Sequence, residues 1–346
     1  MASVHKYPLD YFGRFIADPI RMGAYRQALK RAVRTDSVVL DIGTGTGVFA
    51  FLAAQFGARR VLAVEPHDVI EIGQEVAAAN GLADRIEFIQ ALTTDITLPE
   101  KADIIVSDLH GVLPLFQNHI STIADARERL LAPGGTLIPQ ADTMQAALIH
   151  SPDAYERTYD VPWLRNDLDI DMSVARWRLV NDWHRVSLRA DQMVTEPRQL
   201  AFLDYHIWDE NTCLDSTIDW EIEQPGEAHG AAIWFDSMLL DGVGFSNQPA
   251  DENLIYGQAF FPLEHPVTLT EGDMVQFQIS AKPVDDRHIW HWTTTVTDPS
   301  GARKARYQQS TVWSHIRSFP PFIDVNPDIS LVVMSLFGRC LCPGPG

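Results

Sequence analysis

The sequence predicts a doubly wound parallel α/β half followed by an all-β half. Up to about residue 140, short apolar strands alternate with helical patterns, which is typical of a parallel sheet covered by helices. The first of these strands runs directly into a glycine-rich turn. Beyond Gln199, short β-like runs recur with turn residues between them, which predicts an antiparallel barrel or sandwich. We therefore expect a Rossmann-like domain over residues 1–140 and a β-barrel-like domain over residues 141–346.

The composition indicates which partners the protein could bind and where it is located. The chain has 346 residues, with 27 Lys and Arg against 46 Asp and Glu, and a net charge of −19. Such an acidic surface repels nucleic-acid phosphates and attracts a cationic peptide or small molecule. Of the 3 cysteines, Cys340 and Cys342 lie in a Pro/Gly-rich tail without other metal ligands nearby. We expect no metal site, no membrane segment and a cytoplasmic location.

The glycine turn follows an apolar run and precedes a helical pattern. It carries Gly43, Gly45 and Gly47 at alternate positions, with Asp41 just before the first. A dinucleotide-binding turn has the spacing G-x-G-x-x-G, because a pyrophosphate must sit on the helix N-terminus. The observed spacing therefore disfavours an NAD-dependent oxidoreductase, and an acid beside the turn suits a cationic ligand.

A second acidic position follows the turn at an informative distance. The apolar strand over residues 61–64 ends in Glu65, some twenty residues beyond the turn. At that spacing a carboxylate would accept hydrogen bonds from both hydroxyls of a ribose. Glu65 is therefore a predicted nucleoside-binding residue.

The other elements of the first half follow from the same periodicity. Helices are expected over residues 19–33, 68–80 and 120–131, and strands over residues 85–91, 102–108 and 136–139. Asp18 is suited to cap the first of these helices, with Pro19 at its first position. Arg21, in the first turn, could bind a carboxylate through a bidentate fork.

These motifs resemble those of a known family. The glycine turn and its preceding acid resemble the first motif of class I S-adenosylmethionine (SAM) methyltransferases. Together with a β-rich second half, they make the chain similar to the protein arginine methyltransferase family. The segments that carry the resemblance are 16–26, 38–47, 61–66 and 102–111, and, in the barrel, 195–200 and 233–236. Residues 153–191 would correspond to the family's dimerisation arm, which implies a homodimer.

The resemblance also implies SAM as the cofactor and assigns its contacts. Arg21 would hold the SAM carboxylate, Glu65 would bind the ribose, and a backbone contact at Leu92 would meet the adenine edge. The remaining cofactor positions are those of the turn itself, namely Asp41, Gly43, Gly45 and Gly47. Thr93 stands where the family has an acid, and its role is left open.

The sequence departs from the family at the acceptor site. The family places two glutamates on the loop after the fourth strand, where they flank the substrate guanidinium. Asp108 stands at the first position, and the neutral Gln117 stands at the second. One carboxylate and an amide compensate a buried guanidinium less well than two carboxylates. The family's Thr-His-Trp loop is matched by residues 254–256, which lack the histidine.

Two histidines on the same loop are candidate bases. His110 and His119 have side chains whose ordinary pKa suits proton transfer near neutral pH. The aromatic residues Tyr7, Tyr11 and Phe15 would form a lid over the cofactor or pack between helix and sheet.

The sequence supports three hypotheses for the function, two of them enzymatic and one non-catalytic. The main hypothesis is a SAM-dependent methyltransferase that acts on a nitrogen or oxygen nucleophile of a peptide or small-molecule acceptor. The second is true arginine N-methylation of a protein or peptide, with Glu221 or Glu227 replacing the missing acid. The third is a non-catalytic SAM-binding or scaffold protein.

Overall fold

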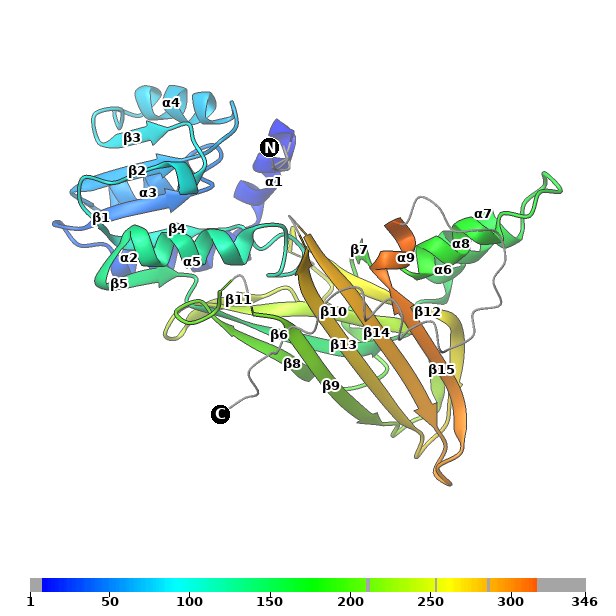
Figure 1. The fold of residues 1–346 in the computed structure, drawn as a ribbon. Helices are drawn as coiled ribbons and strands as arrows, with labels where there is room; N and C mark the ends of the chain where they lie inside the picture. The colour runs from blue at the N-terminus through cyan, green and yellow to red at the C-terminus, as the bar shows by residue number, and fades with distance from the viewer. Residues whose placement is uncertain (1–7, 210–211, 253, 285–286, 316–346) are drawn as a thin grey trace.

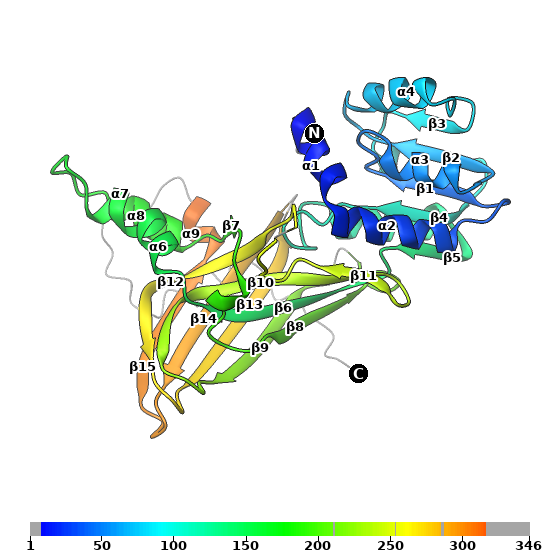
Figure 2. The same cartoon turned by 180° about the vertical axis from the view of Figure 1, so that it is seen from behind.

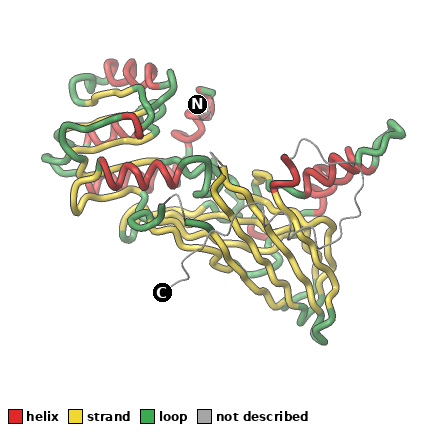
Figure 3. The backbone as a smooth tube through the Cα atoms, viewed as in Figure 1, coloured by secondary structure: helices red, strands yellow, loops and turns green. Residues whose placement is uncertain are grey.

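The structure is a computed structural model that describes residues 8–315 except 210–211, 253 and 285–286. A parallel sheet with its helices forms one half, and antiparallel sheets form the other (Figure 1). Figure 3 shows the helices gathered around the parallel sheet and in an arm at the far end of the barrel. Tyr7, Cys340 and Cys342 lie outside the described residues.

The parallel sheet has the strand order β3-β2-β1-β4-β5. Its strands are β1 Val38–Ile42, β2 Arg60–Val64, β3 Ile86–Ile89, β4 Ala102–Ser107 and β5 Leu131–Ile138. Every residue of β1 is buried, because helices cover both faces of the central strand. From β1 the next strands along the chain are added on one side, and from β4 they are added on the other. The carboxyl ends of the strands at such a switch point form a ligand-binding crevice.

The helices of this half are α1 Leu9–Ala17, α2 Pro19–Ala32, α3 Val48–Gln55, α4 Ile70–Ala79 and α5 His119–Arg129. Asp18 caps α2 by accepting a hydrogen bond from the Arg21 amide at 3.0 Å. Two features differ from the sequence-based expectations. Helix α1 was not expected, and β5 begins at Leu131, whereas the strand was expected only from residue 136.

The second half starts with β6 Ala141–Ile149, directly after β5. One sheet has the order β7-β12-β10-β6-β8 with β11 paired to β10, and the other has the order β15-β14-β13-β9. The further strands are β7 His184–Val186, β8 Arg198–Asp204, β9 Leu214–Glu221, β10 Gly226–Leu240, β11 Val243–Ser246, β12 Gln258–Leu269, β13 Met274–Val284, β14 Arg287–Thr297 and β15 Arg303–Ser310. Strand β8 lies beside β9, and β12 lies beside β15, so the two sheets enclose one apolar interior.

An arm projects from the barrel between β6 and β7 (Figure 2). It contains α6 Pro152–Tyr155, a π-helical turn Glu156–Asp160, α7 Val161–Leu164 and α8 Ser173–Val180. Single 3-10 turns occur at Thr93–Asp95 and Ala190–Gln192, and α9 Thr311–His315 packs near the arm. No helix in the described part of the chain is both long and apolar enough to span a bilayer.

Candidate cofactor and acceptor pocket

A cavity of about 500 Å³ lies at the carboxyl ends of the parallel strands. Its walls come from α1, the glycine turn, the ends of β2 and β4, and the first turns of α5. Of the residues predicted from sequence to form a site, those that line it are Arg21, Gly43, Gly45, Glu65, Leu92, Asp108, Gln117 and His119. The structure thus brings most of the predicted residues to one pocket.

The glycine turn is held by main-chain hydrogen bonds. The amides of Gly43 and Thr44 donate to the carbonyl of Val64 at 2.9 and 3.0 Å. Gly45 has a φ of +53°, and a Cβ there would lie 2.5 Å from the ring of Phe12 in α1. Glycine at this position therefore suits both the left-handed backbone and the close approach of the Phe12 ring.

Asp41 lies beneath the turn. Its fully buried carboxylate accepts hydrogen bonds from the Thr44 hydroxyl at 2.5 Å and the Ala50 amide at 3.0 Å, and burial raises its pKa to about 7. Asp41 and Gly47 are not among the described residues that line the cavity. Asp41 therefore shapes the turn from below, and its part in binding the cofactor stays a prediction.

Glu65 lines the pocket directly after β2. Its two carboxylate oxygens accept hydrogen bonds from the amides of Gly45 and His67, each at 3.1 Å. Burial raises its pKa above the ordinary glutamate value. Each oxygen keeps a further lone pair, so the carboxylate is positioned to accept two more hydrogen bonds from a ligand.

The far end of the pocket is formed by Leu92, Thr93 and Asp125. Arg129 fixes this end because it binds the Asp125 carboxylate through two contacts of 2.6 and 2.5 Å and the Thr93 carbonyl at 3.0 Å. Asp125 was missed in the sequence analysis. Only its place in the helical pattern, one turn before Arg129, indicated an ion pair there.

Arg21 carries the positive charge at the opposite end. Its guanidinium binds Asp108 at 2.5 and 2.6 Å, and its Nε also donates to the Tyr256 hydroxyl at 3.0 Å. Burial lowers the pKa of Arg21, but Asp108 raises it above its usual range. Burial raises the pKa of Asp108, but Arg21 and His110 hold it well below the ordinary value. Both side chains are therefore charged.

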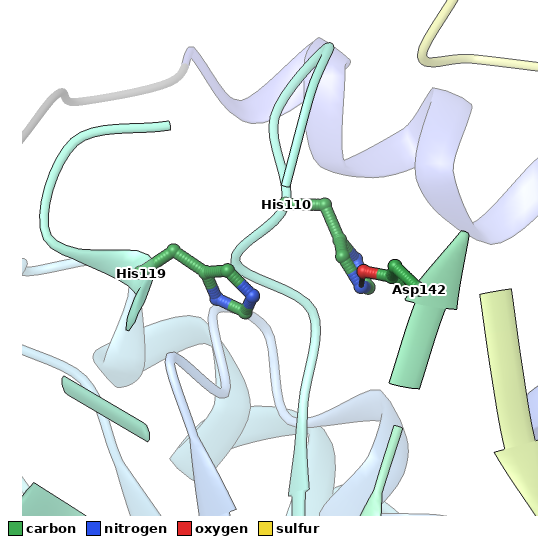
Figure 4. A group of neighbouring side chains, drawn as sticks. All are labelled: His110, His119 and Asp142. Atoms are coloured by element: carbon green, nitrogen blue, oxygen red, sulfur yellow. Dashed lines mark ion pairs between the residues drawn. The ribbon is translucent and has the colours of Figure 1, made fainter. Parts of the chain in front are cut away.

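A buried polar network continues from Asp108 into the barrel. His110 lies between Asp108, 3.1 Å from its Nδ1, and Asp142 of β6, 2.8 Å from its Nε2. The Tyr205 hydroxyl donates to Asp142 and lies 3.0 Å from Nε2 of His119. Figure 4 shows the His110 and His119 rings, both from the loop and helix after β4, turned toward Asp142. Asp142 and Tyr205 were not found from the sequence.

Neither histidine has the properties of the base expected from the sequence. Burial lowers the pKa of His110, but Asp142 and Asp108 raise it to about 10, so the ring is charged at neutral pH. Its fully buried side chain lies outside the set of described residues that line the cavity. Burial, together with the charge of His110, lowers the pKa of His119 to about 3, so His119 is a weak proton acceptor.

Gln117 lines the acceptor end of the cavity in a strained conformation. Its φ of +45° is in the left-handed region, which is uncommon for residues other than glycine. Asn118 follows it in the same wall. Within the described residues that line the pocket, neither Glu221 nor Glu227 is present, so neither replaces the second loop acid.

Comparisons with known proteins agree with this arrangement. The model of the family "Ribosomal protein L11 methyltransferase (PrmA)" matches residues 26–164, and that of the "Arginine methyltransferase oligomerization subdomain" matches residues 141–292. The chain is a class I SAM-dependent methyltransferase, and SAM is its cofactor. The structural features typical of this class are the parallel sheet, its glycine turn and the carboxylate after β2.

Relatives define the family. The chain is 38% identical over 316 residues to "Protein arginine N-methyltransferase PRMT10" of Oryza sativa subsp. japonica, which covers 79% of this chain and 80% of the relative. It is 31% identical over 259 residues to "Probable protein arginine N-methyltransferase 6" of Arabidopsis thaliana, covering 72% of this chain and 58% of that relative. The chain belongs to the protein arginine methyltransferase family.

A solved structure shows the same fold. The Trypanosoma brucei PRMT1 enzyme-prozyme heterotetrameric complex with AdoHcy has a TM-score of 0.77 and 24% identity, covering 86% of this chain and 96% of that chain. The parallel sheet followed by a β-barrel, as expected from the sequence, is confirmed by this likeness.

Proposed function

We propose that this protein transfers a methyl group from SAM to a guanidinium nitrogen of arginine in a peptide or protein. The names of the relatives support this acceptor over the broader range of nucleophiles considered from the sequence. The structural observation that carries the proposal is that the ionised Asp108 and the strained Gln117 both line the pocket.

Three contacts would fix the orientation of the cofactor in the pocket. Arg21 would bind its carboxylate, Glu65 its ribose hydroxyls, and the end formed by Leu92 would receive the adenine. SAM supplies an electrophilic methyl group on its sulfonium. The chain would orient the acceptor for an in-line displacement. The new N–C bond would replace the bond between sulfur and the methyl group, S-adenosylhomocysteine would leave, and the acceptor nitrogen would release one proton to solvent. Asp108 and the Gln117 amide oxygen would each accept a hydrogen bond from the guanidinium.

The acceptor proposal is tested by incubating the protein with SAM and arginine-rich peptides and measuring their masses. A gain of methyl groups on arginine supports it. If methyl groups are found only on other side chains or on small molecules, the pocket takes a different nucleophile. If SAM binds but no acceptor gains mass, the scaffold hypothesis becomes the better one.

Gln117→Glu is expected to raise the rate of arginine methylation about tenfold. A hydrogen bond from a guanidinium to a carboxylate is worth about 1–2 kcal/mol more than one to an amide, and about 1.4 kcal/mol is a factor of ten in rate. The measurement is kcat/KM with an arginine peptide. Asn118→Asp is the matched control, because it adds the same charge one residue further along the same wall. Equal rates in the wild type and Gln117→Glu would show that the guanidinium does not contact residue 117.

We also propose that the arm mediates homodimer formation. Its exposed apolar side chains include Leu164, Leu168, Ile170 and Val174, which are 51–65% exposed in the single chain. The oligomerization-subdomain model covers this region. Sedimentation equilibrium should give a dimer for the wild type and a monomer for Leu168→Lys, since a buried lysine would disrupt an apolar interface. A monomeric wild type would contradict the proposal, as would an unchanged dimer in Leu168→Lys.

A further inference from the structure

A second group of ligand-type side chains lies at the root of the arm, away from the methyl-transfer pocket. His150 directly follows β6, while Glu227 and His229 lie on β10. One ligand atom from each of the three lies within 4.8 Å of the others. Strand β6 and the arm are joined at this point, since α6 starts at Pro152.

The sheet register brings the three side chains together. Strand β10 pairs with β6 so that Gly230 is opposite Ile149, and His229 and His150 are the neighbours of this last pair. The centroids of the two imidazole rings are 5.1 Å apart. Glu227 is two residues before His229 and so points to the same face of the strand. Its Oε2 lies 3.5 Å from Nε2 of His229, close to the separation of two ligands bound to one small cation.

A hydrogen bond at Nδ1 of His150 leaves the lone pair of Nε2 available for a metal ion. Nδ1 of His150 lies 3.0 Å from the carbonyl oxygen of Glu227, so it carries the ring proton and leaves a lone pair on Nε2. A backbone carbonyl on the second ring nitrogen is the usual support of a metal-binding histidine.

We propose that His150, Glu227 and His229 form a binding site for a borderline divalent transition-metal ion such as Zn²⁺. Two imidazoles and one carboxylate are the ligand set that such ions prefer, and the exposed side of His150 leaves the fourth position to water. Coordination by Nε2 of His229 moves its ring proton to Nδ1, so the 3.4 Å hydrogen bond from the Ser151 amide is lost. That cost leads us to expect micromolar binding.

The bound ion would join the start of the arm to the barrel. His229 also packs 5.5 Å, between ring centroids, from Tyr155 of α6, and the Tyr155 hydroxyl donates to the carbonyl of Leu263 at 2.7 Å. A metal bridge between β6 and β10 at this place would therefore restrain the segment that leads into the arm. Because an ion that binds the folded state stabilises it, the melting temperature should rise with Zn²⁺.

The test is titration calorimetry with Zn²⁺ on the full chain without a polyhistidine tag, after treatment with a chelator. The wild type should bind one equivalent, and His150→Gln and His229→Gln should each weaken binding at least tenfold and abolish the Zn²⁺-dependent rise in melting temperature. His265→Gln is the matched control, because His265 is an exposed histidine on β12 outside the cluster and should leave both unchanged.

Two results would overturn the proposal. One is the absence of Zn²⁺ binding by the wild type. The other is equal binding by the wild type, His150→Gln and His229→Gln, which would place the ion elsewhere, such as at His110, His119 and Asp142. His150 is exposed, so the fold of His150→Gln should be retained, and its SAM binding serves as the check.

Discussion

Glu65→Ala is expected to weaken the binding of SAM about 100-fold. The carboxylate would accept hydrogen bonds from two ribose hydroxyls, and a hydrogen bond to a charged group contributes about 1.5–3 kcal/mol. The same carboxylate holds the Gly45 amide at 3.1 Å, so its loss also loosens the glycine turn. Isothermal titration with SAM and with S-adenosylhomocysteine measures the effect.

The controls separate the ribose contact from loss of folding. Glu71→Ala removes an exposed acid from the first turn of α4 and should leave the affinity unchanged. Glu65→Gln keeps an oxygen acceptor and should fall between Glu65→Ala and the wild type. Full affinity in a folded Glu65→Ala variant would show that the cofactor does not use this carboxylate.

His110→Ala is expected to lower the free energy of unfolding by about 3–5 kcal/mol, the usual cost of removing one partner from a buried ion pair. It leaves Asp108 and Asp142 buried together without the cation that lies 3.1 and 2.8 Å from them. Urea denaturation measures the change. His119→Gln is the matched control: its ring is equally buried but neutral, so the loss should be only about 1 kcal/mol. Similar losses in the two variants would contradict a charged His110.

The stability contributed by His110 should depend on pH. The pKa of His110 is raised from 6.5 to about 10 in the folded protein. A raised pKa means that the folded state holds the proton more tightly, so the contribution is complete below pH 6.5 and is lost as the pH rises through about 10. The difference in unfolding free energy between the wild type and His110→Ala should therefore be larger near pH 6 than above pH 10. A constant difference would mean that His110 is neutral throughout.

The elements that sequence reasoning predicted well are those fixed by local patterns. The buried strand before the turn, the Asp18 cap of α2 and the strand that ends at Glu65 all follow from periodicity, capping and spacing within a few tens of residues. The recurring β-like runs after Gln199 predicted the antiparallel half, and the likeness to the family indicated the arm.

The parts that could not be predicted depend on contacts between distant segments. Asp142 meets His110 only because β6 brings it to the loop after β4, and Tyr205, which follows β8, reaches Asp142 and His119. A histidine between two carboxylates has the opposite protonation behaviour from an isolated one, so the expectation of a base at position 110 was wrong. Helix α1, in contrast, has apolar residues at helical spacing, Leu9, Phe12 and Ile16, and this local signal was missed.

The buried network also limits how the enzyme can open. Arg21, Asp108 and His110 belong to the α/β half, whereas Asp142 and Tyr256 belong to the barrel half, and their charged and hydroxyl groups join across the boundary. A hinge motion between the halves would separate buried charges, at a cost of several kcal/mol. Helix α1 buries no residue of its own, so it can move at far lower cost. We therefore expect ligands to enter and leave by displacement of α1 and not by separation of the two halves.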